Sequence, residues 1–264
     1  MKFTKMQGLG NDYLYVFGKV PENIEEISKK LSDRHFGAGS DGMIYIDKSD
    51  IADFKMRIFN ADGSEAKMCG NGIRCVGKYV YDKGYTDKTK LKIETMSGIK
   101  YLDLFVSGGK VKSVSVNMGT AAVFEDTVLN IDGENVTLTP VSVGNPHAVI
   151  FVKDINKAPL LTLGKKIEHH KSFPDGVNVE FVEVIDKNKL RMRVWERGSG
   201  VTMACGTGAC ASAAAAVSKK YFDTDDFVSV HLDGGILKIK IAEDNTVTMI
   251  GPCETVYEGE TEIC

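Results

Sequence analysis

Several features are missing from this 264-residue chain, and each absence narrows the range of functions. The chain has no run of about 18 apolar residues, the length that a membrane-spanning helix requires. Lys and Arg form no dense stretch interleaved with aromatic residues, and the formal net charge is −3, so the basic surface typical of nucleic-acid binding is lacking. The first residues contain no long apolar core of the kind that a secretion signal has. We therefore expect a soluble, cytoplasmic protein that binds neither membranes nor nucleic acid.

Cysteine is also scarce, with six residues in the whole chain. Without a secretion signal, so few cysteines predict free thiols rather than a disulfide framework. Cys and His do not form the paired C-x-x-C spacing of a zinc site, so we expect no metal. Four of the six are interpreted as small buried or terminal residues, namely Cys75, Cys210, Cys253 and Cys264. The remaining two, Cys69 and Cys205, each precede Gly-x-Gly.

The two C-G-x-G motifs belong to an internal duplication. Cys69 and Cys205 lie 136 positions apart, and the same offset aligns residues 56–60 with residues 192–196. Two further pairs align at an offset of 134, namely Gly10-Asn11 with Gly144-Asn145 and Asp41-Gly42 with Asp175-Gly176. Four paired landmarks with one two-residue slip indicate two related halves.

Each half repeats the order strand, loop, helix around its cysteine. Alternating apolar residues predict strands over 54–59 and 190–194, and each is followed by a helix, over 71–83 before Gly84 and over 206–219. The second helix carries small apolar residues on every side, so we expect it to be buried. Further short strands are predicted over 91–94, 100–106, 111–116, 179–185, 228–232 and 236–241.

These elements predict an α+β fold of two pseudo-symmetric domains. Each domain is expected to be a mostly antiparallel, β-barrel-like sheet wrapped around one central helix. The first would comprise residues 1–117 plus a returning C-terminal strand at about 252–264, and would carry Cys69. The second would comprise residues 118–251 and carry Cys205.

A cysteine immediately before a helix feels the positive end of the helix dipole, which favours its thiolate. The backbone N–H groups at the two helix starts can also bind a carboxylate; they belong to Gly70, Asn71, Gly206 and Thr207. Two such helix starts facing each other would hold a carboxylate between two thiols. That arrangement suits inversion of a stereocentre beside a carboxylate, because one thiolate can remove the α-proton while the other thiol delivers a proton to the opposite face.

The chain resembles the diaminopimelate epimerases, amino-acid epimerases that use no pyridoxal phosphate. The matching segments span nearly the whole chain in family order, and they are residues 8–13, 59–64, 68–75, 144–148, 176–178, 195–198 and 204–209. C-G-x-G alone would be modest support, whereas the combined match is highly specific. One position departs from the pattern, because some family members carry glutamine where this chain has Gly42.

The resemblance implies the conversion of LL-diaminopimelate to the meso form, a step toward lysine and the cell-wall diamino acid. It implies that Cys69 and Cys205 are the acid/base pair and that Gly70-Asn71 and Gly206-Thr207 hold the carboxylate at the reacting centre. It further assigns substrate polar groups to Asn11, Asn60, Asn145 and Asn178, and the distal carboxylate to Arg197. His147 and Glu196 would assist beside the cysteines, Glu196 also contacting substrate, and family habit implies a homodimer.

Two alternatives stay open at this point. The first is a racemase of the same architecture that acts on proline, hydroxyproline or histidine; Arg197 and the four asparagines argue for a substrate with a second amino-acid end. The second is a non-catalytic redox or binding protein whose two thiols switch by forming a disulfide. In the first case proline would be inverted faster than diaminopimelate, and in the second no turnover would occur.

Overall fold

The computed structural model describes residues 1–263 and divides into two compact units. The first unit comprises Met1–Val116 and the segment that starts at Gly251, and the second comprises Asn117–Ile250. The chain passes from one unit to the other within strand β8 (Lys110–Thr120) and returns within β18 (Thr246–Pro252).

The first unit is built on a mixed sheet. Its spatial order is β19-β1-β2-β3-β4-β6-β7-β8, and every neighbouring pair is antiparallel except β2/β3 and β4/β6. A parallel pair requires a crossover, and helices α1 and α2 provide the two crossovers. The bounds are β1 Lys2–Gly8, β2 Asn11–Phe17, α1 Ile24–Ser32, β3 Gly42–Asp47, β4 Phe54–Asn60, β5 Glu65–Ala66, α2 Gly70–Asp82, β6 Lys90–Thr95, β7 Gly98–Ser107 and β19 Glu254–Glu260.

The second unit repeats this plan. Strands β12/β13 and β14/β16 are its parallel pairs, and the other pairings are antiparallel. A short helical segment crosses over between the first pair and helix α4 between the second. The bounds are β9 Ala122–Val123, β10 Thr127–Ile131, β11 Glu134–Ser142, β12 Pro146–Phe151, η1 Ile155–Lys157, η2 Leu160–Gly164, α3 Lys165–Glu168, β13 Asn178–Asp186, β14 Lys189–Glu196, β15 Gly200–Val201, α4 Gly206–Ser218, β16 Phe227–Leu232 and β17 Gly235–Ile241.

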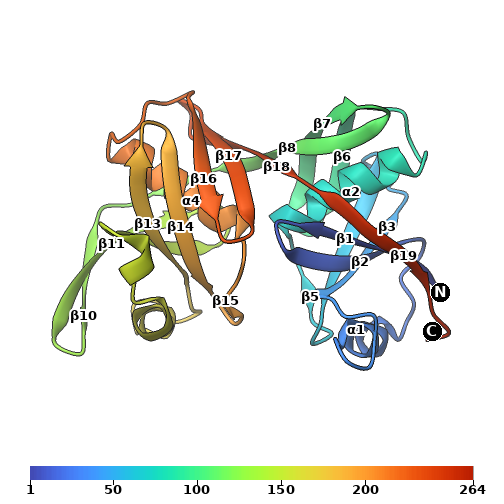
Figure 1. Cartoon of the computed structure of the whole chain (residues 1–264), viewed down its shortest axis with the longest axis horizontal. Coiled ribbons are helices and arrows are strands. Elements are labelled where there is room, and N and C mark those ends of the chain that lie inside the picture. The colour runs from blue at the N-terminus through green and yellow to red at the C-terminus, as the bar shows by residue number, and fades with distance from the viewer. Residues whose placement is uncertain (264) are drawn as a thin grey trace. The chain divides into compact units, whose positions relative to one another are not determined.

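One helix lies at the centre of each unit, with strands around it (Figure 1). Helix α2 packs against β1, β2, β7 and β19, and α4 packs against β9, β11, β12, β13, β14, β16 and β17. The α4 side chains Ala209, Cys210, Ala211 and Ala213 are fully buried, because small residues let strands approach the helix from several directions. The predicted fold class, an antiparallel-rich sheet around a central helix in each half, is confirmed.

The helices that cross over between the first parallel pairs were not predicted. Helix α1 carries Ile24, Ile27 and Leu31 on one buried face, at the spacing of an amphipathic helix, so the sequence did contain its signal. The segment from Ile155 to Glu168 had a weaker signal, because three short helical types follow one another within it. Both segments connect a pair of parallel strands, which a short turn cannot join.

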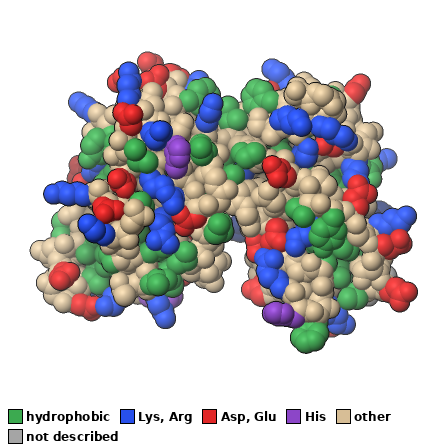
Figure 2. Space-filling view, in the orientation of Figure 1, with side chains coloured by type: hydrophobic (Ala, Val, Ile, Leu, Met, Phe, Trp, Pro, Cys, Tyr) green, Lys and Arg blue, Asp and Glu red, His purple; other side chains and the backbone are tan. Residues whose placement is uncertain are grey.

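None of the helices within residues 1–263 is long and apolar enough to cross a membrane. On the face seen in Figure 2, acidic and basic side chains are interspersed over each unit, with hydrophobic side chains between them. Charges of one sign do not gather into a stripe on that face.

The cysteines within residues 1–263 form no disulfide. Cys75, Cys210 and Cys253 are buried as predicted, and Cys205 is buried as well, whereas Cys69 is only half-buried. The sixth, Cys264, lies outside the described residues.

Burial of Cys75 predicts a loss of stability at alkaline pH. Burial raises the pKa of this thiol from 9.0 to about 11, although the Tyr15 hydroxyl and Arg74 act in the opposite direction. The folded state therefore holds the proton more tightly than the unfolded chain, so the stabilisation is complete below pH 9 and is lost as the pH rises toward 11. We expect this loss to reach about 2–3 kcal/mol. Urea unfolding from pH 8 to 11 should show it, and Cys75→Ala should remove that part of the slope; equal slopes would contradict the prediction.

Candidate active site

The two predicted cysteines occupy the same position in their units, the residue that caps the central helix. Cys69 caps α2, and its Sγ accepts a hydrogen bond from the backbone N–H of Gly72 at 3.3 Å. Cys205 caps α4, and its Sγ accepts from the N–H of Gly208 at the same distance. Both caps have extended backbone angles, as N-caps usually do. The duplication therefore places two thiols at equivalent helix N-termini, where the local dipole favours negative charge.

Amide and phenol groups surround Cys69. The thiol donates to Oδ1 of Asn11 at 3.3 Å. Burial raises the pKa of the Tyr13 phenol well above its ordinary value, and the neighbouring Cys69 and Asp41 add to this shift. Behind the helix start lies the fully buried Arg74, which donates to the Asn71 side chain at 3.1 Å and to the Gly70 carbonyl at 3.0 Å. The first turn of α2 is thus held rigidly beside the thiol.

Carboxylates surround Cys205. Burial raises the pKa of this thiol well above its ordinary value, and Glu196 and Glu180 raise it further, while Thr207 and the Gly208 N–H act in the opposite direction. The sequence alone predicts a lowered pKa for a thiol at a helix start, and for Cys205 that expectation is wrong. Desolvation and two nearby negative charges outweigh the helix dipole there.

Glu196 shares the buried environment of this thiol. Burial raises the pKa of its carboxyl group, with Glu180 adding to the shift, although hydrogen bonds with Thr202 and Cys205 act in the opposite direction. The Thr202 hydroxyl donates to Oε1 of Glu196. Cys205 and Glu196 are therefore two hydrogen-bonded titratable groups, and burial raises the pKa of each above its ordinary value. Such a pair can pass one proton between them.

A second chain of polar groups reaches Cys205 through the fully buried pair His147 and Glu180. Nδ1 of His147 lies 2.7 Å from Oε1 of Glu180, and Nε2 lies 3.1 Å from Oδ1 of Asn145. The Asn145 amide donates to the Thr207 hydroxyl at 3.3 Å, which lies 3.5 Å from the Cys205 thiol. Among the described residues, Oε2 of Glu180 is a buried polar side-chain atom without a hydrogen-bond partner. These contacts form a continuous polar path to the thiol.

Asn178 and Arg197 lie next to one another in the same unit. Oδ1 of Asn178 accepts from the backbone N–H of Arg197 at 3.0 Å, and Nδ2 donates to the Pro146 carbonyl at the same distance. The guanidinium of Arg197 donates to the carbonyl of Asp175 at 3.1 Å. Because β12 and β13 are parallel with His147 opposite Asn178, this pair lies beside the His147 path. In the second unit the structure thus links Asn145, His147, Thr207 and Cys205 in one polar path, with Asn178 and Arg197 beside it.

The sequence predicts that Asn60 binds substrate with the residues around Cys69, but its side chain hydrogen-bonds within its own turn. It ends β4, and its amide donates to the Ser64 hydroxyl within the following turn at 3.1 Å. Its neighbour across the sheet is Gly42, which has a φ of +153°. A Cβ atom at Gly42 would lie 2.2 Å from the carbonyl oxygen of Phe59, so this backbone admits no side chain there. The backbone of this chain therefore requires glycine at position 42.

Three carboxylates that lie beside the predicted residues were not themselves predicted as site residues. Glu180 lies on the buried strand β13, and a charged residue inside an apolar strand was the available signal. Glu168 accepts from the Trp195 indole at 2.6 Å and from the Gly198 N–H at 2.7 Å, so it braces the turn that carries Glu196 and Arg197. Asp41 appeared only as a landmark of the duplication, although it hydrogen-bonds with Asn11. Within residues 1–263, His, Cys, Asp and Glu form no group of three or more that could hold a metal ion.

Comparison with known proteins identifies the family. The model of the family "Diaminopimelate epimerase" matches residues 3–124 and 139–256. The diaminopimelate epimerase of Acetivibrio thermocellus is 51% identical, over 100% of this chain and 99% of the relative.

Two solved structures share the fold at 17% identity. A phenazine biosynthesis protein of the PhzF family from Bacillus anthracis has a TM-score of 0.81, covering 100% of this chain and 99% of its own. A hydroxyproline epimerase from Agrobacterium vitis has a TM-score of 0.77, covering 98% and 91%. This architecture therefore occurs in proteins with different names, and the sequence match is what separates them. With its family model spanning most of the chain and half of its residues identical to a relative over the full length, the chain belongs to the diaminopimelate epimerase family.

Proposed function

We propose that this protein interconverts LL-2,6-diaminopimelate and meso-diaminopimelate without a cofactor, as an isomerase (EC 5.1.1.7) of lysine and peptidoglycan-precursor biosynthesis. The observation that carries the proposal is the pair of thiols at equivalent helix N-caps, Cys69 on α2 and Cys205 on α4. Inversion of an α-carbon needs one proton acceptor and one proton donor, and a duplicated thiol supplies both. The family membership specifies the substrate.

In the proposed mechanism one cysteine acts as thiolate and the other as thiol. The thiolate takes the α-proton, so that the C–H bond breaks, an S–H bond forms, and the electron pair spreads into the carboxylate. The opposite thiol then gives its proton to the other face of the α-carbon and becomes the thiolate. Backbone N–H groups of Gly70, Asn71, Gly206 and Thr207 would stabilise the charge that develops on the carboxylate.

The residues around each thiol have separate roles in this proposal. Glu196 and the His147 path would exchange a proton with Cys205, because both lie within its polar network. Arg197 would bind the distal carboxylate, for which a guanidinium fork is geometrically suited. The substrate's amino groups and remaining polar atoms are assigned to Asn11, Asn60, Asn145 and Asn178. We further propose that the enzyme works in the cytoplasm and as a homodimer.

A substrate screen in deuterated water tests the proposal. We expect the protein to invert LL-diaminopimelate and to place deuterium only at the α-carbon that changes configuration, because only that proton passes through a thiol that exchanges with solvent. Mass spectrometry and chiral chromatography would follow both results. Proline, hydroxyproline and histidine serve as competing substrates. Faster inversion of proline would overturn the choice of substrate, and deuterium at both α-carbons of the meso product after one inversion would contradict the regiochemistry.

Oxidation of the same two thiols tests the two-thiol mechanism, whereas the non-catalytic redox alternative predicts no turnover in either oxidation state. If they form a disulfide, neither sulfur can carry a proton, so oxidation should abolish epimerisation and reduction should restore it. Activity that survives complete disulfide formation would exclude a two-thiol mechanism.

A further inference from the structure

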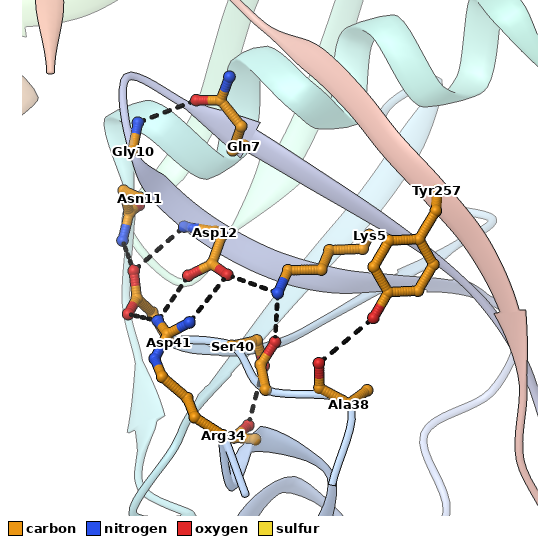
Figure 3. Close-up of polar contacts among 12 residues, drawn as sticks. Lys5, Gln7, Gly10, Asn11, Asp12, Arg34, Ala38, Ser40, Asp41 and Tyr257 are labelled. Carbon is orange, nitrogen blue, oxygen red and sulfur yellow. Dashed lines mark hydrogen bonds and ion pairs between the residues drawn. The ribbon is translucent and has the colours of Figure 1, made fainter.

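Asn11 and four charged side chains form a hydrogen-bonded group that we call the Asp41 cluster. Its members are Lys5, Asn11, Asp12, Arg34 and Asp41. The Asn11 amide donates to Oδ2 of Asp41 at 2.7 Å, and the same oxygen accepts the backbone N–H of Asp12 at 3.1 Å. Figure 3 shows Asp41 between Asn11 and Arg34, with Lys5 on the far side of Asp12. The cluster thus joins the starts of β2 and β3 directly behind a residue that contacts the Cys69 thiol.

Asp41 determines which way the Asn11 amide points. An ionised carboxylate only accepts hydrogen bonds, so the NH₂ end of Asn11 must face Asp41. The carbonyl end then faces Cys69, where it accepts the thiol proton with an Sγ–Oδ1 distance of 3.3 Å. A reversed amide would place two oxygens against each other at Asp41 and offer an N–H group to the sulfur.

The rest of the cluster keeps Asp41 in place. Arg34 donates to Oδ1 of Asp41 at 2.9 Å and to both carboxylate oxygens of Asp12, at 2.8 and 3.2 Å. Lys5 pairs with Asp12 at 2.9 Å and donates to the Gly39 carbonyl at 2.6 Å. The backbone closes the frame, because the Asp41 N–H donates to the Asp12 carbonyl at 2.7 Å. Although burial acts to raise it, the pKa of Asp12 is lowered by its hydrogen bonds with Arg34 and Lys5.

The second unit lacks this arrangement. Asn145, the counterpart of Asn11, donates to Thr207 and lies beside His147 instead. Asp175, the counterpart of Asp41, contributes its backbone carbonyl to Arg197. Any effect of Asp41 through an asparagine therefore falls on one thiol.

We propose that Asp41 is a positioning residue for the proton transfer at Cys69. It fixes the orientation of the Asn11 amide, so that the carbonyl oxygen of Asn11 accepts the hydrogen bond from the Cys69 thiol. This inference rests on the proposed function for its effect on turnover, but its effect on the thiol does not depend on substrate. The carbonyl oxygen stabilises the thiol over the thiolate at Cys69, whereas a reversed amide would do the opposite. Asp41 thereby controls how readily Cys69 gives up and regains its proton.

The test compares Asp41→Asn with Asp53→Asn. Asp53 is a matched control in the same unit, because it also accepts from one cationic side chain, Lys88 at 2.6 Å, and from one backbone N–H, Lys92 at 2.8 Å. The Asp41 and Arg34 side chains are 38% and 54% exposed, so their ion pair adds little to stability and the variant should fold. Mass spectrometry of both thiols during iodoacetamide alkylation gives the Cys69/Cys205 rate ratio, with Cys205 as an internal reference.

We expect Asp41→Asn to free the Asn11 amide to rotate. The Cys69/Cys205 alkylation ratio at pH 8 should then rise at least about threefold. The value of kcat/KM should fall about 10- to 100-fold, because misplacement of an acid/base group lowers the rate steeply. Asp53→Asn should change neither quantity by more than about twofold. A purely structural role would speed both alkylations together and leave the ratio constant. An unchanged ratio in Asp41→Asn would overturn the proposal, whatever happens to turnover.

A second variant protects the test against misfolding. Arg34→Gln leaves Asp41 in the chain but removes its cationic partner, so the ratio should move in the same direction by a smaller amount. If the wild-type protein inverts no diaminopimelate, the proposed function fails, yet the alkylation ratio still decides the role of Asp41. If turnover is normal in the wild type and the ratio is constant in both variants, only the role of Asp41 fails.

Discussion

Replacing either Cys69 or Cys205 by alanine is expected to lower kcat/KM for diaminopimelate inversion by at least about 10³-fold. Each thiol is one of the two groups that carry the proton, and a positioned acid or base contributes on the order of 10²–10⁴-fold. Alanine keeps the helix but removes both the proton carrier and the N-cap acceptor of Gly72 or Gly208. Coupled assays of purified variants at saturating and limiting substrate measure the loss.

The same variants should retain half of the chemistry. With one thiol left, the α-proton of one diastereomer can still be removed and returned on the same face, so in deuterated water that diastereomer should exchange without inversion. The two variants should exchange opposite diastereomers, which also assigns each cysteine to its face. Cys210→Ala is the matched control, because Cys210 is a fully buried thiol on the same helix as Cys205 and lies outside the proposed chemistry. Inversion within tenfold of wild type in either Cys69→Ala or Cys205→Ala would rule out the two-thiol mechanism.

The helix starts were predictable because their determinants are local. A cysteine followed by Gly-x-Gly sets both the cap geometry and the direction of the first N–H groups, and the duplication showed that this happens twice. The central helices consequently begin and end within one residue of the prediction, and Gly84 adopts the left-handed φ of +76° expected after α2. Helix α1, by contrast, was missed although its apolar spacing was regular.

The surroundings of the thiols could not be predicted in the same way. Asp41 meets Asn11 from 30 positions away, and Glu180 meets His147 from 33 positions away, because parallel pairing of β2/β3 and β12/β13 brings those strand starts together. Crossover connections of this length leave no local pattern in the sequence. The pKa of Cys205 depends on these through-space neighbours, which is why the helix start alone predicted its direction wrongly.

The duplicated fold therefore places similar caps in dissimilar surroundings. Cys69 faces an amide whose orientation is fixed by Asp41, whereas Cys205 is buried among carboxylates. A racemase must hold its two acid/base groups in opposite protonation states at the start of each turnover, and two identical surroundings would give no preference. Glu196 is the carboxylate with the largest effect on the pKa of Cys205, so its removal is the sharpest test of this asymmetry.

Glu196→Gln is expected to make Cys205 more acidic and the enzyme about 10²-fold slower. Burial is the main cause of the raised pKa of Cys205, and the negative charge of Glu196 is the next. Removing that charge lowers the pKa of the thiol, so its thiolate fraction at a fixed pH increases and iodoacetamide alkylation of Cys205 becomes faster. Turnover should fall nonetheless, because glutamine cannot accept the Cys205 proton, and general-base assistance is worth about 10²–10⁴-fold.

Alkylation rates measured from pH 7 to 10, with Cys69 as the reference thiol, separate this effect from a change in fold. Glutamine can still accept the Thr202 hydroxyl through its carbonyl oxygen, so the turn should stay intact. Glu183→Gln is the control, because Glu183 lies on β13 and accepts the Ile155 N–H at 2.8 Å instead of contacting the thiol. If the alkylation rate of Cys205 relative to Cys69 is unchanged or lower in Glu196→Gln at every pH between 7 and 10, the carboxylate does not set the protonation of this thiol. The raised pKa of Cys205 would then have to arise from burial and from Glu180.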